Sequence, residues 1–346
     1  MPLVSAYAAP AAGQPLEAAE VAIREVGPHD VLIDVERTGL CHTDIHLVNE
    51  EWGPATFPMV PGHEIAGVVA AVGSGVTSHR VGDRVGVGCM VDSCGECEAC
   101  LAGQEQMCAR GATQTYDDTG RDGRITYGGY ARQVVVDARF VLRIPDALAL
   151  DEAAPLLCAG ITTYSPLKRW GAGPGTRVAV IGMGGLGHLA VKIAHAMGAE
   201  VTVLSQTLSK EEDGRRLGAD DYRATSDPAT FTELAGRFDL VLSTVSAPLD
   251  MGAHLGLLRA GGAMVLLGIP EAPLPVHAFS LIMGNRILTG SNIGGIAETQ
   301  EMLDFCATHG IGAEVETVAA ADIDASYARM VRSDVRYRFV LDTSTI

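Results

Sequence analysis

The chain has 346 residues, an apolar share of 47% and a formal net charge of −17. This length exceeds the usual span of one hydrophobic core, so we expect two domains. The acidic balance argues against binding a nucleic acid backbone, no apolar stretch reaches the roughly 20 residues that span a bilayer, and the N-terminus lacks the pattern of a secretory signal. We therefore expect a cytoplasmic protein with reduced thiols, and neither nucleic acid nor membrane as a partner.

Short alternating apolar runs fill the chain as far as about Arg143, and turn residues separate them. VLIDVERTG and IAGVVAAVG are examples of the runs, and PGH and VGDRVG are examples of the turns. Side chains of a strand alternate between two faces, so this pattern indicates many short strands. The region is predicted to form a barrel-like β domain.

Two segments of this region carry possible metal ligands, CHTDIH beginning at Cys41 and PGHE ending at Glu64. A catalytic zinc ion takes three protein ligands and keeps a fourth position for water or a substrate oxygen, and Cys2His is one known set. Cys41 and His63 would supply two of the three. Cys158, further along the chain, is the candidate for the third, although spacing alone leaves packed core residues as the alternative.

Four of the eight cysteines lie within fifteen positions as C-x2-C-x2-C-x7-C, at Cys94, Cys97, Cys100 and Cys108. Thiolates at this spacing can surround a tetrahedral zinc ion and leave no open position, so the predicted site is structural. The alternatives are disulfides, which a reducing compartment disfavours, and an iron-sulfur cluster, whose bacterial run ends C-x3-C-P. Cys89 and Cys306 have no partner in the sequence and are interpreted as small core residues.

From about Asp151 the pattern changes to helices and strands in alternation. The strand RVAVIG is followed by a helical run that ends at Gly198 and by the strand EVTVLS, which together indicate a βαβ unit. Further apolar runs follow at FDLVLSTV, GAMVLLGI and RILTGSNI. Continuous apolar runs are typical of parallel strands that are buried on both faces, so a doubly wound parallel sheet is predicted.

The loop GMGGLG comes directly after the first of these strands and directly before the helix. This context indicates a dinucleotide site, in which glycines permit a tight turn and bring the pyrophosphate close to the N-terminus of the helix. The predicted contacts in the loop are Gly182, Gly184, Gly185, Leu186 and Gly187.

The residues after EVTVLS favour NADP(H) over NAD(H). An NAD site places Asp or Glu about 20 residues beyond the loop, to accept the ribose 2′-hydroxyl. Here that position is Ser205, and no carboxylate follows until Glu211. Ser205 can donate to a 2′-phosphate and Lys210 can neutralise part of its charge, and the alternative for Lys210 is a solvated helix start.

Taken together, these motifs make the chain resemble a zinc-containing medium-chain alcohol dehydrogenase of the cinnamyl alcohol dehydrogenase branch. The resemblance runs nearly end to end, through GLCHTDIH, FPMVPGHEIAGVV, VGDRVGVGCMVDSCGECEAC, LLCAGITTYSPL, GMGGLGHLAVKIAHAMGAEV and LTGSNIGG. It implies an α/β protein with a chaperonin-10-like β-barrel catalytic domain, residues 1–155 and 292–346, whose structural zinc lobe lies around residues 89–109. Residues 156–291 would form the Rossmann dinucleotide-binding domain.

The resemblance also implies roles for single residues. Cys41, His63 and Cys158 would hold the catalytic zinc, with Glu64 as an alternative fourth ligand and Asp44 orienting His63. With the structural zinc this makes two zinc ions per chain. Gln206 stands where an Arg is often found in similar enzymes, which weakens the preference for NADP(H). The remaining implied cofactor contacts are Thr162, Thr244, Gly268 and Ile293.

The chemistry implied is hydride transfer between NADP(H) and a primary alcohol or aldehyde, including benzylic and cinnamyl types, polarised by zinc. Thr43, two residues from Cys41, would begin a proton relay that passes the cofactor ribose and ends at His46, for which an exposed loop histidine is the alternative reading. A homodimer would extend the sheet through the strand at residues 287–293. Two other functions remain open, a reductase of C=C or C=N bonds and a non-enzymatic protein that binds zinc and nucleotide.

Overall fold

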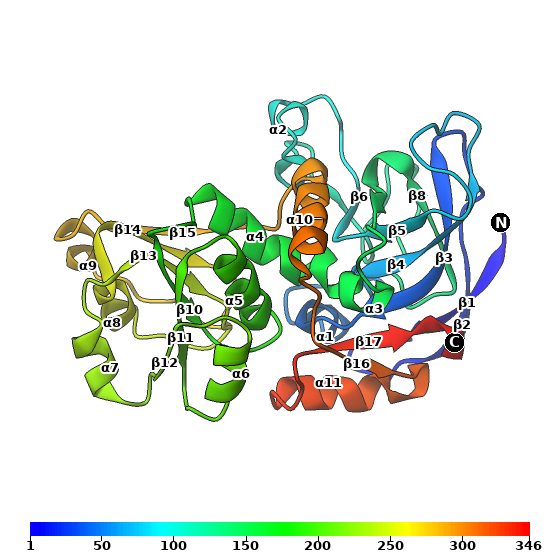
Figure 1. Ribbon diagram of the computed structural model, residues 1–346. Helices are drawn as coiled ribbons and strands as arrows, with labels where there is room; N and C mark the ends of the chain where they lie inside the picture. Colours follow the sequence, from blue (N-terminus) through cyan, green and yellow to red (C-terminus); the bar gives the residue numbers. More distant parts are fainter. The chain divides into compact units, whose positions relative to one another are not determined.

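The computed structural model describes residues 1–346, and the chain forms two compact units (Figure 1). The first unit contains Met1–Cys158 and Gly294–Ile346, and the second contains Ala159–Ile293. The chain thus leaves the first unit after Cys158 and returns to it at Gly294. None of the helices combines the length and the apolar composition that spanning a bilayer requires.

The first unit is built around a seven-stranded sheet with the order β16-β17-β3-β4-β5-β9, in which β8 also pairs with β3. All pairs are antiparallel except β16 with β17. Because Val340 of β17 pairs with Gly39 of β3, the C-terminal segment completes a sheet that the N-terminal segment begins. The strands are β3 (Asp30–Gly39), β4 (Ile65–Val72), β5 (Arg84–Val87), β8 (Gln133–Asp137), β9 (Leu142–Arg143), β16 (Val315–Val318) and β17 (Arg338–Asp342).

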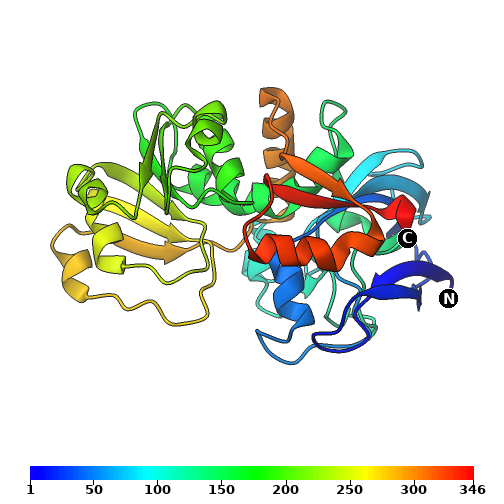
Figure 2. The ribbon, with the colours of Figure 1, turned by 90° about the horizontal axis from the view of Figure 1, so that it is seen from below.

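Smaller elements surround this sheet. Figure 2 shows α11 lying along β16 and β17, and Tyr327 and Met330 of this helix share one apolar core with Phe339 and Leu341 of β17. The two short sheets are β1 (Leu3–Ala8) with β2 (Glu17–Ala22), and β6 (Met90–Asp92) with β7 (Thr113–Gln114). The helices are α1 (His42–Val48), α2 (Glu98–Leu101), η1 (Glu105–Met107), η2 (Ala138–Phe140), α3 (Leu150–Ala153), η3 (Ala154–Leu157), α10 (Ile296–His309), η4 (Ala320–Asp322), α11 (Ile323–Val331) and η5 (Thr343–Thr345).

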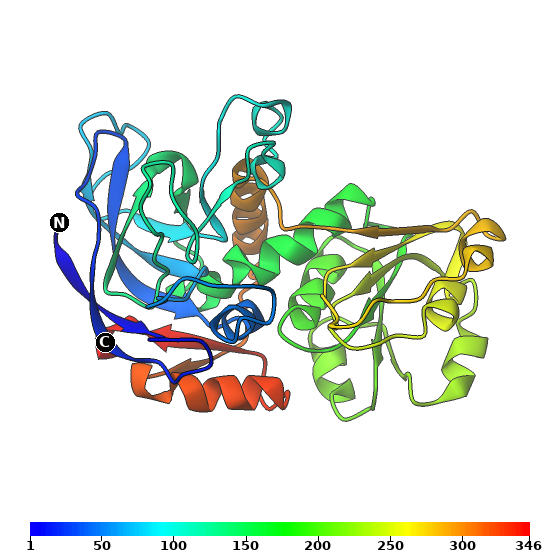
Figure 3. The ribbon, with the colours of Figure 1, turned by 180° about the vertical axis from the view of Figure 1, so that it is seen from behind.

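The second unit is a six-stranded parallel sheet with the order β12-β11-β10-β13-β14-β15, covered by helices (Figures 1 and 3). This is the strand order of a dinucleotide-binding fold built from two βαβαβ halves. Its strands are β10 (Arg177–Ile181), β11 (Glu200–Ser205), β12 (Asp221–Ala224), β13 (Phe238–Ser243), β14 (Leu258–Leu266) and β15 (Ile287–Gly290). Its helices are α4 (Ala159–Arg169), α5 (Gly187–Ala196), α6 (Glu211–Arg216), α7 (Pro228–Glu233), α8 (Met251–Gly256) and α9 (Ala278–Ile282).

The last strand of this sheet is shorter than the sequence predicts. RILTGSNI suggested a strand as far as Ile293, whereas β15 ends at Gly290. Ile293 has a φ of 34°, outside the extended region of the backbone, so pairing cannot continue through it. The end of the predicted strand is instead the segment by which the chain returns to the first unit.

Candidate active site

Four buried metal-ligating groups converge in the first unit. Cys41 lies between β3 and α1, His63 and Glu64 directly precede β4, and Cys158 directly follows η3. One ligand atom from each of the four residues lies within 4.8 Å of the others. Sulfur, nitrogen and carboxylate oxygen are the ligand atoms that zinc takes in proteins, and Oε2 of Glu64 is buried without a hydrogen-bond partner. The donor set and the orphaned oxygen therefore fit a zinc ion.

A hydrogen bond between the two thiols of this cluster shifts their pKa values in opposite directions. A hydrogen bond with Cys158 lowers the pKa of Cys41 well below its ordinary value, and the same contact raises the pKa of Cys158 well above it. A divalent cation between the two sulfurs would favour the thiolate of both residues, because a thiol loses its proton when it binds a metal. The cluster is thus arranged for a cation rather than for two neutral thiols.

Arg338 of β17 pairs with Glu64, and sequence reasoning did not find it. Both side chains are buried, and Nη2 of Arg338 contacts Oε1 of Glu64. Burial raises the pKa of Glu64 to about 8, against the opposing effect of the Arg338 guanidinium. Gly39 makes room for this carboxylate, since a Cβ at that position would lie 1.8 Å from Oε2 of Glu64.

The residues expected to relay protons lie on or beside α1. The sulfur of Cys41 lies 3.6 Å from Oγ1 of Thr43. The ring of His46 stacks on Trp52 at 4.5 Å between centroids, and its Nδ1 contacts a carboxylate oxygen of Glu51. The hydrogen bond with His46 lowers the pKa of Glu51, so this carboxylate stays ionised. Sequence reasoning did not single out Glu51.

Two further groups surround the same cluster. Asp44, within α1, places Oδ1 3.3 Å from Nδ1 of His63. Cys89, interpreted from the sequence as a core residue, hydrogen-bonds with the thiol of Cys158, and this contact lowers the pKa of Cys89. No local motif pointed to Cys89, because its partner is 69 positions away in the chain.

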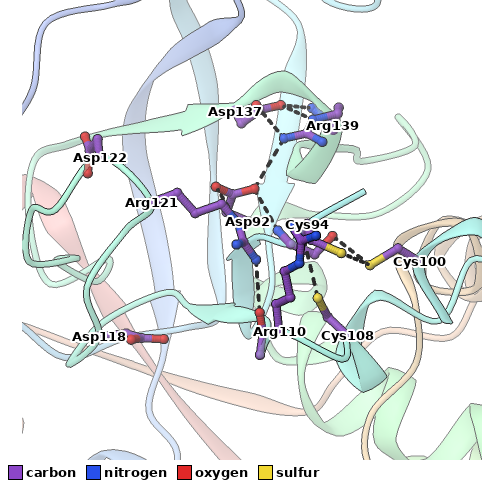
Figure 4. A network of polar contacts seen from close by, with 12 residues as sticks. Asp92, Cys94, Cys100, Cys108, Arg110, Asp118, Arg121, Asp122, Asp137 and Arg139 are labelled. Atoms are coloured by element: carbon purple, nitrogen blue, oxygen red, sulfur yellow. Dashed lines mark hydrogen bonds and ion pairs between the residues drawn. The ribbon is translucent and has the colours of Figure 1, made fainter. Parts of the chain in front are cut away.

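The cluster of Cys94, Cys97, Cys100 and Cys108 forms a second group whose ligand atoms lie within 4.8 Å of one another. Figure 4 shows three of the four, Cys94, Cys100 and Cys108. The sulfurs of Cys94 and Cys100 are 3.8 Å apart. Tetrahedral zinc with bonds of about 2.3 Å places two sulfurs about 3.8 Å apart, so the cluster has the dimensions of a zinc site. The backbone N–H of Ala109 donates to Cys97 at 3.4 Å and lowers the pKa of that thiol to about 6.

Ion pairs and a helix contact anchor this lobe to the rest of the first unit. Asp92, two residues before Cys94, pairs with Arg121 at 3.5 Å and with Arg139 of η2 at 3.3 Å (Figure 4). On the other side, Oε2 of Glu105 accepts from the backbone N–H of Ile296 at 3.0 Å, at the start of α10. The lobe therefore has the polar anchors that a structural zinc site needs to brace its surroundings.

The GMGGLG loop of the second unit joins β10 to α5, as the sequence predicts. Gly182 has a φ of 95°, which its neighbours in the loop do not share, and a Cβ on Gly187 would lie 2.0 Å from the carbonyl oxygen of Gly182. A Cβ on Gly184 would meet no atom within 4 Å. The first glycine thus makes the turn, the third permits helix-to-strand packing, and the second faces open space where a pyrophosphate can approach.

The other predicted cofactor residues of this unit are spread along it. Ser205 is the last residue of β11, and Thr244 and Gly268 follow β13 and β14. Nζ of Lys210 donates to the carbonyl oxygen of Met183 at 2.9 Å, so this lysine reaches back to the glycine loop. Gln206 is exposed beside Ser205, Thr162 is buried within α4, and Ile293 ends the unit.

Comparison with known proteins agrees with both units. Residues 27–146 match the model of the alcohol dehydrogenase GroES-like domain, and residues 185–308 match that of the zinc-binding dehydrogenase domain. NADP-dependent alcohol dehydrogenase C 1 of Mycolicibacterium smegmatis is 62% identical over 100% of this chain and 99% of its own length.

Two solved structures are also similar over nearly the whole chain. A cinnamyl alcohol dehydrogenase of Sorghum bicolor is 42% identical with a TM-score of 0.96, and covers 99% of this chain and 98% of its own. The cinnamyl alcohol dehydrogenase of Helicobacter pylori complexed with NADP(H) is 39% identical with a TM-score of 0.93, at the same coverage.

The site and fold define a zinc-binding dehydrogenase. The chain belongs to the zinc-containing alcohol dehydrogenase family, and cinnamyl alcohol dehydrogenases are among its similar members. The predicted fold class, a GroES-like catalytic domain with a Rossmann-like domain, is confirmed.

The glycine loop yields a prediction that separates folding from cofactor binding. Gly187→Ala should lower the free energy of unfolding by about 1–3 kcal/mol, because its Cβ would overlap the Gly182 carbonyl. Gly184→Ala should leave the melting temperature unchanged and weaken NADPH binding about tenfold, or about 1.4 kcal/mol. Differential scanning fluorimetry and fluorescence titration with NADPH measure the two effects. Unchanged NADPH affinity in Gly184→Ala would contradict the assignment of this loop to the pyrophosphate.

Proposed function

We propose that this protein is a zinc-dependent alcohol dehydrogenase, acting also as an aldehyde reductase, that transfers a hydride between NADP(H) and primary alcohols or aldehydes. The observation that carries this proposal is the convergence of Cys41, His63, Glu64 and Cys158 in one unit of a chain whose other unit carries a dinucleotide loop. The relatives support it, since one is named an NADP-dependent alcohol dehydrogenase and another is complexed with NADP(H). Benzylic and cinnamyl compounds are the proposed substrate types.

Cys41, His63 and Cys158 would hold the catalytic zinc, with Glu64 as an alternative ligand, and the four-cysteine cluster would hold the structural one. When bound, the catalytic zinc polarises the substrate oxygen and the nicotinamide carries the hydride. Arg338 pairs with Glu64 and would compensate the charge of its carboxylate, because an unpaired charge would be costly at this buried position.

Thr43 and His46 are the proposed proton carriers. The hydroxyl of Thr43 lies beside the sulfur of Cys41, where it can exchange a proton with the substrate oxygen through Oγ1. His46 is held at Nδ1 by Glu51, so Nε2 is the ring nitrogen left to exchange a proton with solvent. The stacking of Trp52 on His46 fixes the plane of the ring.

NADP(H) is the proposed cofactor because the end of β11 offers donors and no carboxylate. Ser205 can donate to a 2′-phosphate, with Gln206 beside it, and Lys210 contributes a positive charge that is already turned toward the glycine loop. Glu211, the first carboxylate after this point, binds Arg215 at 2.9 Å. The further proposed contacts with the cofactor are the loop glycines with Leu186, Thr162, Thr244, Gly268 and Ile293.

We also propose a homodimer and a cytoplasmic location. β15 is an edge strand, and large apolar side chains beside it are exposed, Ile282 at 67% and Met283 at 73%. Pairing two such edges would cover this surface and remove an unpaired row of backbone groups. All eight cysteines are free, which fits a reducing compartment.

The function is tested on purified protein whose metal content is known. We expect two zinc ions per chain, NADPH-dependent reduction of benzaldehyde and cinnamaldehyde, and the mass of a dimer by light scattering. The measurements are zinc analysis, the rate of NADPH oxidation by absorbance over an aldehyde panel, and reduction of an enone as a comparison. Exclusive reduction of C=C or C=N bonds would assign the other reductase chemistry. NADPH binding without turnover of any compound would assign a non-enzymatic role.

The relay is tested with Thr43→Val. This variant loses the hydroxyl but keeps the volume, so kcat should fall about 100-fold or more while zinc content and NADPH affinity stay unchanged. Thr308→Val, on α10, is the matched control and should behave as the natural protein does. Turnover of Thr43→Val near the natural rate would remove Thr43 from the mechanism.

Cofactor preference is tested with Ser205→Asp. A carboxylate facing a 2′-phosphate repels it, so the ratio of Kd for NADPH to Kd for NADH should rise about tenfold or more. Ser205→Ala, which removes the donor without adding charge, should give a smaller change in the same direction. The two Kd values are measured by fluorescence titration, and an unchanged ratio in Ser205→Asp would refute the phosphate assignment.

A further inference from the structure

We propose that three tyrosines, Tyr116, Tyr130 and Tyr327, are positioning residues for the catalytic zinc. The hydroxyl groups of Tyr116 and Tyr130 hold the carboxylate of Asp44, and the hydroxyl of Tyr327 donates to that of Tyr130. Tyr116 also holds the ring of His63, so that His63 is presented to the metal in one orientation. This inference rests on the zinc site of the proposed function, and none of the three tyrosines would touch the zinc or the substrate.

The carboxylate of Asp44 is buried, and most of the groups that donate hydrogen bonds to it are uncharged. Its side chain is 0% exposed, and its one ion-pair partner within 4.0 Å is the imidazole of His63. Burying a carboxylate is costly unless it is hydrogen-bonded. Five donors surround its two oxygens: Cys41 N–H at 2.8 Å and Tyr130 O–H at 3.2 Å on Oδ2, and Tyr116 O–H at 2.6 Å, Gly62 N–H at 3.3 Å and His63 Nδ1 at 3.3 Å on Oδ1.

Tyr116 acts on His63 in two ways. Its hydroxyl donates to the same Asp44 oxygen that faces Nδ1 of His63, and its ring stacks on the His63 ring at 5.9 Å between centroids with an interplanar angle of 20°. One contact fixes the carboxylate that orients the imidazole, and the other fixes the plane of the imidazole. With Nδ1 engaged by Asp44, Nε2 is the nitrogen left for a metal.

Tyr130 and Tyr327 extend this network to the C-terminal segment. Tyr327 of α11 donates to the hydroxyl of Tyr130 at 3.1 Å, and Tyr130 in turn donates to Asp44. The ring of Tyr130 lies against Gly62, where an added Cβ would be 2.6 Å from Cδ1 of the ring. Gly62, which precedes His63, is thus packed against Tyr130, and α11 holds Tyr130 in place through Tyr327.

These hydroxyl groups indicate positioning rather than packing alone. Phenylalanine would fill the same buried volume without placing a polar atom in the core, where an unsatisfied hydroxyl is costly. Removal of a group that hydrogen-bonds to a metal ligand commonly lowers the affinity for the metal about 10- to 100-fold. A packing role predicts a lower melting temperature with unchanged zinc binding, whereas a positioning role predicts faster loss of zinc.

The test compares Tyr116→Phe, Tyr327→Phe and the control Tyr127→Phe, a half-buried tyrosine of the same unit outside the network. Zinc transfer from the holoenzyme to a chromophoric chelator gives the release rates, and the absorption spectrum of the cobalt-substituted enzyme reports the ligand geometry. Tyr116→Phe should release one of its zinc ions about tenfold faster and shift the cobalt bands. Tyr327→Phe should show a smaller change in the same direction, and Tyr127→Phe none.

Release of both zinc ions at the natural rate from Tyr116→Phe, with an unshifted cobalt spectrum, would overturn the proposal, whatever happens to the melting temperature. If Tyr116→Phe fails to fold, the same two measurements on Tyr327→Phe test the proposal. This change disturbs folding less, because the hydroxyl of Tyr327 is one hydrogen bond further from Asp44. A natural protein that holds no zinc ion beyond the one in the four-cysteine cluster would instead overturn the proposed catalytic site itself. The two failures are therefore distinguishable.

Discussion

Two carboxylates and two thiols lie buried together around His63, and the rest of the catalytic unit is arranged to make that burial possible. Glu64 has Arg338 as its charged partner, and Asp44 has neutral donors and the imidazole. Charges taken out of water must be paired or hydrogen-bonded, so each of these carboxylates requires partners from elsewhere in the fold. A bound zinc ion would favour the ionised forms of the thiols and of Glu64, because a cation stabilises the negative charge of its ligands.

Those partners explain why the catalytic unit is discontinuous in sequence. β17 carries Arg338 and pairs with β3, which leads directly into Cys41. α11 carries Tyr327, whose hydroxyl reaches Asp44 through Tyr130. The segment that returns at Gly294 therefore does more than complete a sheet, because it supplies Arg338 to Glu64 and the hydroxyl of Tyr327 to the network around Asp44.

The four-cysteine lobe has a different physical role. Four sulfurs around a zinc ion would leave no open position for a substrate, so the proposed role of this cluster is to fix the loop between Asp92 and Glu105. Asp92 is tied to Arg121 and Arg139, and Glu105 accepts from the first N–H of α10. A zinc ion in this lobe would thereby hold together the segments that carry Asp92 and Glu105.

The sequence by itself predicted the family, which the comparisons confirm, and it placed the glycine loop and the four-cysteine cluster, because these motifs depend on residue types at short, recognisable spacings. The candidate catalytic ligands Cys41, His63 and Cys158 are far apart in the chain, and only the resemblance to the family connected them. The sequence also determined the absence of a carboxylate at Ser205. Only the tertiary structure decided the partners of these groups, namely Arg338 for Glu64, the tyrosines for Asp44 and the thiol of Cys89 beside Cys158. Arg338 is 274 positions from Glu64. An isolated Arg, Tyr or Cys has no local pattern, so its role emerges only when strands and helices distant in the chain pack together.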